Sequence, residues 1–261
     1  VPNKTYTILN LYNMVVEFMK ADIVCEGGGV KGIALLGAIY YLEEKGYTFQ
    51  NFAGTSAGAI VSSLLAVGYT GKELKELLLN IKFTDFYEKN KLSLLPFIGP
   101  TISLFKNKGL FSGNNVEEYL NKLYKAKGKH KFKDIAVNGK SPLKVIASDV
   151  TNKKLLVLPD DLKNYNIDPL EFEIAKAVRM SISIPFYFNP VILKYGKESS
   201  YIVDGGIFSN FPIWLFDVDG IPKWPTFGLK LLSDNDLKKT SPNKSNLITY
   251  SCDIVDTLFA N

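Results

Sequence analysis

The segment Gly54-Thr55-Ser56-Ala57-Gly58 joins an apolar, β-prone run to an almost wholly apolar helical run. A G-x-S-x-G pentapeptide between a strand and a helix is typical of a nucleophile elbow, a sharp turn that exposes the serine hydroxyl. The small residues around Ser56 suit a strained backbone, and the start of the following helix favours negative charge at the serine. A simple helix N-cap would have the same residues, so the pentapeptide alone leaves open whether Ser56 is a nucleophile.

The runs around this turn follow the order strand, glycine-rich turn, helix, strand, elbow, helix. Strands are expected over Ala21 to Glu26, Phe49 to Thr55, Leu143 to Ala147, Leu155 to Leu158, Tyr201 to Val203 and Thr226 to Leu231. Helices are expected over Ile33 to Glu44, Ala57 to Val67, Gly71 to Ile81, Asn115 to Lys125 and Leu170 to Met180. This alternation of strands and helices predicts an α/β sandwich with parallel strands at its centre.

A second glycine motif, Gly27-Gly28-Gly29-Val30-Lys31-Gly32, follows the first predicted strand and opens the first predicted helix. It matches the G-x-G-x-x-G pattern of dinucleotide sites, which also need an acidic residue at the end of the next strand to bind the ribose. Here the next strand runs into the elbow, so that acid is missing. The neighbouring serine favours a different use of the exposed amides, an oxyanion hole with Lys31 supplying positive charge nearby.

A nucleophilic serine needs a base, and His130 is the only histidine among the 261 residues. It lies in a polar, lysine-rich stretch, where it is most simply a solvated loop residue. The run Val203-Asp204-Gly205-Gly206 instead places an acid at a strand end, before two glycines that allow close backbone approach. Alone this run is most simply an Asp-Gly turn. Together with the two glycine motifs it makes Asp204 the candidate base.

The ordered motifs G-G-G-x-K-G, G-T-S-A-G and D-G-G resemble the patatin-like phospholipase family, which uses a Ser-Asp dyad and no histidine. The resemblance extends over most of the chain, through the segments Lys144 to Asp149, Arg179 to Phe186 and Asp204 to Pro212. It implies a three-layer α/β/α sandwich with a central, mostly parallel sheet. We expect residues 1–261 to form one such domain, with the apolar stretch 85–112 as a lid-like insertion or, equally, a secondary core.

By this resemblance Ser56 is the nucleophile that attacks an acyl ester carbonyl, and Asp204 is the general base that takes its proton. The oxyanion binds the amides of Gly28, Gly29 and Val30, with Lys31 contributing charge, and an acyl-enzyme forms on Ser56. The glycines that the motifs supply are Gly27, Gly32, Gly54, Gly58, Gly205 and Gly206. Because an unperturbed Asp titrates at about 4, we expect partial burial to raise the pKa of Asp204.

The composition limits the other functional classes. The net charge of +5 favours an anionic membrane surface, while the scattered basic residues argue against nucleic acid. We expect no transmembrane helix or signal peptide, no metal or cofactor, and a cytoplasmic protein that binds membranes peripherally. Cys25 and Cys252 are too few for a disulfide framework. The sequence does not indicate a protein or lipid activator.

The expected function is that of a lipid acyl hydrolase of the phospholipase A type, acting on fatty-acyl esters of glycerophospholipids. Two alternatives remain open at this point. One is an acyltransferase or thioesterase with the same serine elbow, although acyltransferases of that kind normally require a histidine partner. The other is a catalytically silent lipid-binding protein.

Overall fold

The computed structural model describes residues 19–80 and 106–232. At its centre is a seven-stranded sheet in the order β7-β8-β4-β2-β1-β9, with β5 pairing with β4 off this path. The strands are β1 (Lys20–Cys25), β2 (Thr48–Thr55), β4 (Leu143–Asp149), β5 (Lys154–Leu158), β7 (Val191–Tyr195), β8 (Glu198–Asp204) and β9 (Thr226–Leu229). The pairs β9–β1, β1–β2 and β2–β4 are parallel. Since β7 runs opposite to β8, only β5 and β8 oppose the other five strands.

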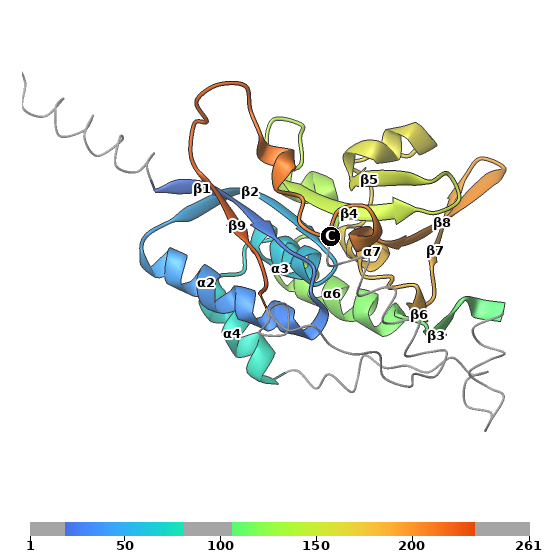
Figure 1. The fold of residues 1–261 in the computed structure, drawn as a ribbon, viewed down its shortest axis with the longest axis horizontal. Helices are drawn as coiled ribbons and strands as arrows, with labels where there is room; N and C mark the ends of the chain where they lie inside the picture. The colour runs from blue at the N-terminus through green and yellow to red at the C-terminus, as the bar shows by residue number, and fades with distance from the viewer. Residues whose placement is uncertain (1–18, 81–105, 233–261) are drawn as a thin grey trace, which may run out of the picture.

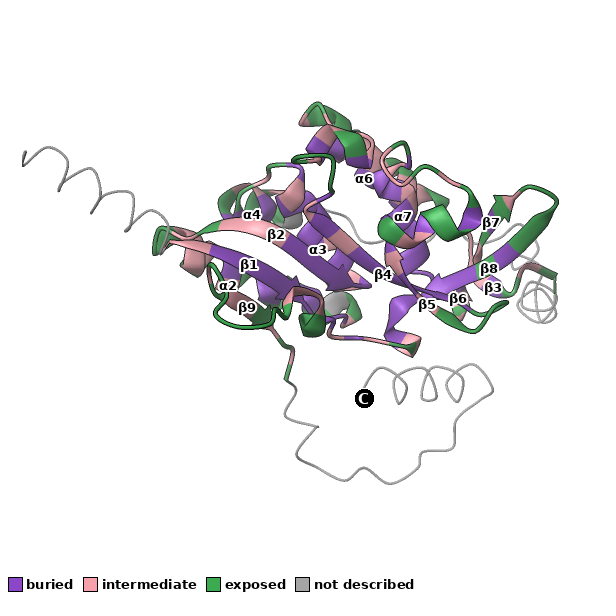
Figure 2. Ribbon diagram, turned by 90° about the horizontal axis from the view of Figure 1, so that it is seen from above, coloured by how far each residue is buried: buried purple, intermediate pink, exposed green. Residues whose placement is uncertain are grey.

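Helices flank this sheet. The α-helices are α2 (Ile33–Glu44), α3 (Ala57–Ala66), α4 (Gly71–Asn80), α6 (Asn114–Ala126) and α7 (Ile174–Ser181). Figure 1 shows them gathered on one side of the sheet, with the short 3-10 helices η5 (Asp160–Tyr165) and η7 (Ile213–Phe216) on the other. The predicted α/β class with a mostly parallel central sheet is therefore confirmed. Figure 2 shows that buried residues follow the central strands, and most residues of α3 and α7 are buried as well.

The predicted elements agree best with the structure around the glycine motifs. The helix expected from Leu170 begins later, at Ile174, because the residues before it bind the 3-10 helix η4 (Phe132–Ile135) instead. Phe132 N–H donates to the Phe172 carbonyl, and Lys133 N–H donates to that of Leu170. The sequence does not predict β7, nor the three-residue strands β3 (Gly109–Phe111) and β6 (Phe186–Phe188), which pair with each other in parallel. Residues 85–105 of the expected lid-like insertion lie outside the described residues.

The pairing of β4 brings the ends of two distant strands together. Val145 and Ile146 pair with both β2 and β5, and Ala147 to Asp149 pair with both β5 and β8. A strand has only two edges, so β2 and β8 occupy successive stretches of the same edge of β4. The last residue of β2, Thr55, pairs with Ile146, and the last residue of β8, Asp204, pairs with Ala147. The C-terminal ends of β2 and β8 therefore meet at adjacent positions on this edge of β4.

None of the helices in residues 19–80 and 106–232 combines the length and apolarity that crossing a bilayer requires.

Candidate active site

Ser56 occupies a strained turn between β2 and α3. Its backbone has φ 52° and ψ −121°, a conformation that side-chain-bearing residues rarely adopt. Such a conformation costs on the order of 1–3 kcal/mol and persists only where the surrounding structure enforces it. The turn is also nearly closed to solvent, since Ser56 is only 5% exposed. The geometry is that of the elbow predicted from the pentapeptide.

The two glycines of the pentapeptide allow α3 to pack directly against the sheet. A Cβ on Gly58 would lie 2.1 Å from the Cys25 carbonyl oxygen, and one on Gly54 would lie 2.4 Å from the Gly58 carbonyl. Real Cβ atoms do not approach backbone so closely, so any side chain here would force α3 away from β1 and β2. These glycines thereby fix the direction in which the turn presents Ser56.

Asp204 ends β8 and is fully buried. Its Oδ1 accepts a hydrogen bond of 2.8 Å from the Gly206 N–H, while no described group hydrogen-bonds Oδ2. Burial raises the pKa of this carboxyl to about 7, and the Gly206 amide and the nearby Ser56 hydroxyl only partly oppose that effect. Burial is thus complete where the sequence suggested it would be partial. The Ser56 hydroxyl is thus close enough to affect this carboxyl, and because catalytic hydrogen bonds are often long without substrate, the arrangement suits a base facing its nucleophile.

A second buried carboxylate, Asp149 at the end of β4, shows why the environment of Asp204 is distinctive. Asp149 accepts hydrogen bonds from the Tyr165 hydroxyl, the Asn152 side chain and the N–H groups of Thr151 and Asn152. Burial acts to raise the pKa of Asp149, but these donors together outweigh it and lower the pKa. Asp149 is therefore held as a carboxylate, whereas Asp204 can exchange a proton near neutral pH.

The first glycine motif lies against the elbow. A Cβ on Gly32 would come within 2.9 Å of the Ala57 Cβ, so the absence of a side chain lets the 3-10 helix η1 (Gly29–Gly32) approach α3. Gly27 is tied to the segment after Asp204, because it exchanges hydrogen bonds with Asn210 in both directions. The motif, the elbow and the D-G-G segment thus converge on one place.

The start of η1 leaves backbone N–H groups of that motif without an acceptor. In the described part of the chain, the N–H groups of Gly28 and Gly29 donate no hydrogen bond, whereas Lys31 N–H donates to the Gly28 carbonyl. The first N–H groups of a helix have no intrahelical acceptor. Gly29 also has φ +54°, which glycine adopts without strain. The Lys31 side chain is exposed at the same turn.

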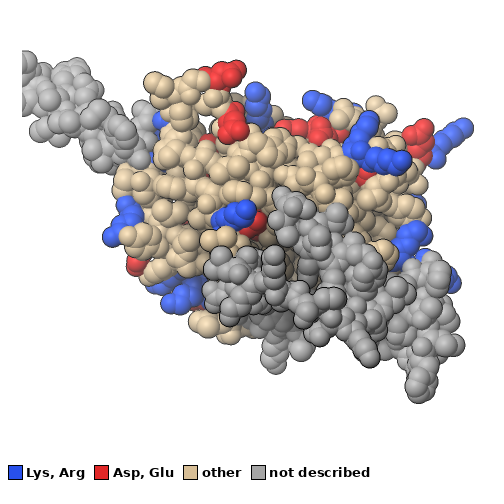
Figure 3. All heavy atoms as spheres, viewed as in Figure 1, with Lys and Arg blue, Asp and Glu red and all other residues tan. Residues whose placement is uncertain are grey.

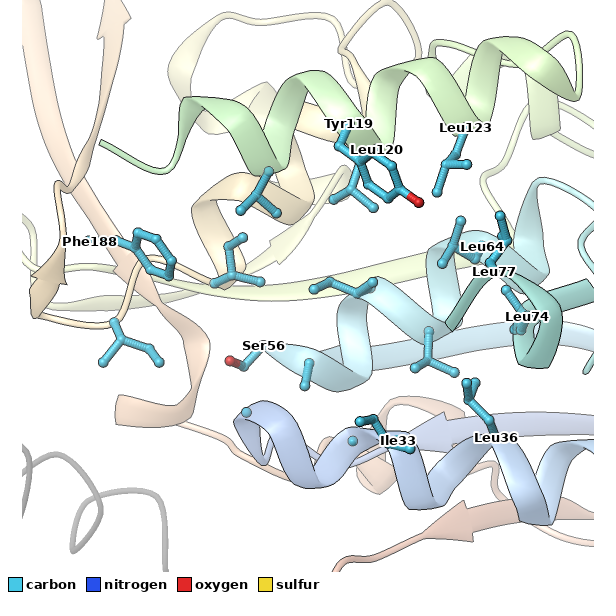
Figure 4. A pocket seen from close by; sticks show the side chains of 18 of the residues that line it. Ile33, Leu36, Ser56, Leu64, Leu74, Leu77, Tyr119, Leu120, Leu123 and Phe188 are labelled. Atoms are coloured by element: carbon cyan, nitrogen blue, oxygen red, sulfur yellow. The ribbon is translucent and has the colours of Figure 1, made fainter. Parts of the chain in front are cut away.

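A cavity of about 350 Å³ opens beside Ser56. Its walls are almost entirely apolar and come from η1, α2, α3, α4, α6 and the segment from Ile182 to Phe188. Figure 4 shows Ser56 between Phe188 at one side and a leucine cluster at the other, formed by Leu64, Leu74, Leu77 and Leu123. A cavity with such a lining has the apolar character that an apolar chain requires and offers few polar partners. The cavity forms only when these separate elements pack together, so no single sequence motif predicts it.

The side-chain contacts of His130 are with residues outside this site. One ring nitrogen, Nδ1, is 2.8 Å from Asn121 Oδ1, and the other, Nε2, is 3.5 Å from a Glu173 carboxylate oxygen. Neither partner belongs to the glycine motifs or to the D-G-G segment. Among residues 19–80 and 106–232, no three His, Cys, Asp or Glu side chains gather as metal ligands would.

Comparison with known proteins finds a matching family model, similar sequences and solved structures. A family model described as Patatin-like phospholipase matches residues 23–217. An uncharacterized Bacillus subtilis protein, YqhO, is 44% identical over 82% of this chain and 72% of its own. The probable lipid hydrolase 463L of Invertebrate iridescent virus 6 is 32% identical over 73% of this chain and 61% of the viral protein. The crystal structure of VipD from Legionella pneumophila aligns with a TM-score of 0.48 and 19% identity, over 79% of this chain and 49% of VipD.

Proposed function

Because the chain belongs to the patatin-like phospholipase family, we propose that it cleaves fatty-acyl esters of glycerophospholipids through a Ser56–Asp204 dyad. Membership of the family supports a lipid-hydrolysing esterase. The observation that carries the finer proposal is a single juxtaposition: a serine in a strained turn, beside a fully buried carboxylate, at the wall of an apolar cavity. The phospholipase A type and the dyad are the parts that experiment must test.

The chemistry follows from the groups at this junction. Ser56 Oγ forms a bond to the ester carbonyl carbon as its proton passes to Asp204 Oδ2, and the amides of Gly28, Gly29 and Val30 bind the oxyanion. Collapse of the tetrahedral intermediate breaks the ester bond, and the alcohol leaves with the proton from Asp204. Water then attacks the acyl-enzyme and gives a proton to Asp204. When this second intermediate collapses, the bond to Ser56 Oγ breaks, Asp204 returns the proton to Oγ, and the fatty acid is released. A pKa of about 7 lets Asp204 accept and return protons near neutral pH.

In this proposal the cavity beside Ser56 binds the acyl chain of the substrate. From Ser56 to Leu64 the α3 helix rises about 12 Å, at about 1.5 Å per residue. An extended chain of single bonds advances about 1.2 Å per bond, as the polypeptide backbone itself shows. The leucine cluster is therefore reached only by acyl chains of about ten bonds or more, and each buried methylene contributes about 0.8 kcal/mol.

Filling the far end of the cavity should change chain-length preference. Leu77→Trp places a larger side chain beside Leu64 (Figure 4), so kcat/KM for palmitoyl esters should fall about tenfold or more, with butyryl esters nearly unaffected. The matched control is Leu79→Trp on the same helix, because Leu79 is 77% exposed and does not line the cavity. Assays on a series of p-nitrophenyl esters measure the effect. Equal losses for short and long chains would contradict this assignment of the cavity.

We further propose that the protein works at a phospholipid membrane surface as a peripheral protein. Ile33, 40% exposed, lines the cavity, and Phe186, 51% exposed, is flanked by the lining residues Ile184 and Tyr187. Exposed apolar side chains beside an apolar opening suit contact with lipid. Figure 3 shows Lys and Arg dispersed among Asp and Glu on the viewed face, so the net charge of +5 supplies only a diffuse attraction to anionic lipid.

The histidine tests the choice between a dyad hydrolase and an acyltransferase that needs an imidazole. His130→Ala should keep kcat within about twofold of the unmodified protein, because its ring contacts Asn121 and Glu173 rather than Ser56. Hydrolysis of a soluble ester, with the melting temperature recorded alongside, measures this. A loss of kcat of about 100-fold with an unchanged melting temperature would instead make His130 part of the catalytic machinery.

A further inference from the structure

Ser181, the last residue of α7, holds the backbone of the elbow. It is fully buried, and its Oγ accepts a hydrogen bond of 2.9 Å from the Ser56 N–H. Ser56 lies beyond the last paired residue of β2, so its N–H has no partner in the sheet, and a residue that starts a helix has none within that helix either. The Ser181 hydroxyl is therefore the acceptor for the Ser56 N–H, which would otherwise be buried without a hydrogen bond.

Two residues further along, the backbone of Ser183 binds the backbone of Asp204, the other residue of the proposed dyad. Its carbonyl oxygen accepts a hydrogen bond of 2.9 Å from the Asp204 N–H. Asp204 is the last residue of β8, where pairing ends at Ala147, so this contact fixes the backbone at the position that presents the carboxylate. One short segment of the chain thus binds the main chain of both Ser56 and Asp204.

Arg179 in turn fixes this segment. It is only 2% exposed, and its guanidinium donates to the Ser183 hydroxyl and to the carbonyls of Ser112 and Asn189. The Ser183 hydroxyl closes the arrangement by donating to the Arg179 carbonyl at 2.7 Å. The buried guanidinium therefore ties the end of α7 to the residues that follow β3 and β6. The segment has little freedom to shift relative to the two strand ends that it joins.

From these contacts we infer that Ser181 and Ser183 are positioning residues that set the distance between the Ser56 hydroxyl and the Asp204 carboxylate, with Arg179 as their anchor. This inference rests on the proposed function. It also has a chemical consequence. Because the Ser56 N–H is already bound to Ser181, it is not available to an oxyanion, in keeping with the proposal that the amides of Gly28, Gly29 and Val30 bind it.

The test is Ser181→Ala in the full chain, assayed with p-nitrophenyl butyrate and with a fluorophosphonate probe. We expect kcat and the labelling rate of Ser56 to fall about 10- to 100-fold, with KM within about twofold, because substrate binding is not altered. Ser181→Thr, which keeps the hydroxyl, should restore most of kcat. The control is Ser148→Ala, which deletes an equally buried hydroxyl that has no hydrogen-bond partner among the described residues. It should leave kcat unchanged.

Ser181→Ala with unaltered kcat would overturn the inference, and so would an equal loss in Ser148→Ala. A Ser181→Thr protein that melts normally but stays as slow as Ser181→Ala would also overturn it. Failure of the proposed function is a distinct result, since the unmodified protein would then neither hydrolyse the ester nor label at Ser56.

Discussion

Replacing Ser56 with Ala should abolish ester hydrolysis, lowering kcat by about 10⁴-fold or more, because the oxygen that forms the acyl-enzyme is removed. The melting temperature should change little. Alanine meets the same backbone strain at φ 52°, and the Ser56 N–H that binds Ser181 is retained. Release of fatty acid from phosphatidylcholine vesicles, measured by mass spectrometry, gives the activity, and Ser148→Ala is again the matched control. Fatty-acid release by Ser56→Ala at more than a few per cent of the normal rate would place the nucleophile elsewhere.

Asp204→Asn should lower kcat by about 10³-fold or more, since an amide cannot accept the serine proton and the remaining catalysis comes from the oxyanion donors and substrate binding. The same substitution should leave the protein folded, because Asn has the shape of the protonated acid. Its stability at different pH values provides a second, independent readout of the burial of this carboxyl.

The sign of the stability effect follows from the raised pKa of Asp204. The folded protein holds the Asp204 proton up to about pH 7, whereas the unfolded chain loses it near pH 4. Protonated Asp204 therefore contributes stability that is fully present below about pH 4 and is lost as the pH rises through about 7. Asn stays neutral throughout, so Asp204→Asn should raise the melting temperature more at about pH 8 than at about pH 5.

Asp149→Asn is the control for that measurement, since the pKa of Asp149 is lowered and its ionised form is the one the fold stabilises. It should lower the melting temperature at both pH values, because the Tyr165 hydroxyl and the backbone donors lose a charged acceptor. If Asp204→Asn also lowered the melting temperature at about pH 8, Asp204 would be a stabilised carboxylate and a poor candidate for the base.

The sequence predicts the parts of the site that depend on local backbone geometry. Gly54 and Gly58 flank Ser56 because a Cβ at either position would strike backbone, and a constraint of that kind is visible in a pentapeptide. The same holds for Gly32 against Ala57. These close approaches also identify the strand-turn-helix units, and hence the parallel centre of the sheet.

The remaining features depend on contacts between distant segments. That Asp204 faces Ser56 follows from two strands sharing one edge of β4, which no motif spacing reveals. The sequence also cannot tell which buried carboxylate lacks donors, and here Asp149 has several where Asp204 has the Gly206 amide. Ser181 looks like any small residue of a buried helix until its hydroxyl is seen to accept the Ser56 N–H.

The central claim is that Asp204, and not a histidine, activates Ser56. The most direct measurement is the rate at which a fluorophosphonate modifies Ser56 as a function of pH, in the unmodified protein, Asp204→Asn and His130→Ala. The account predicts an adduct on Ser56 whose rate of formation rises with a midpoint near pH 7, unchanged in His130→Ala and slow at every pH in Asp204→Asn. Labelling of Asp204→Asn at the normal rate, or loss of the pH dependence in His130→Ala, would contradict it.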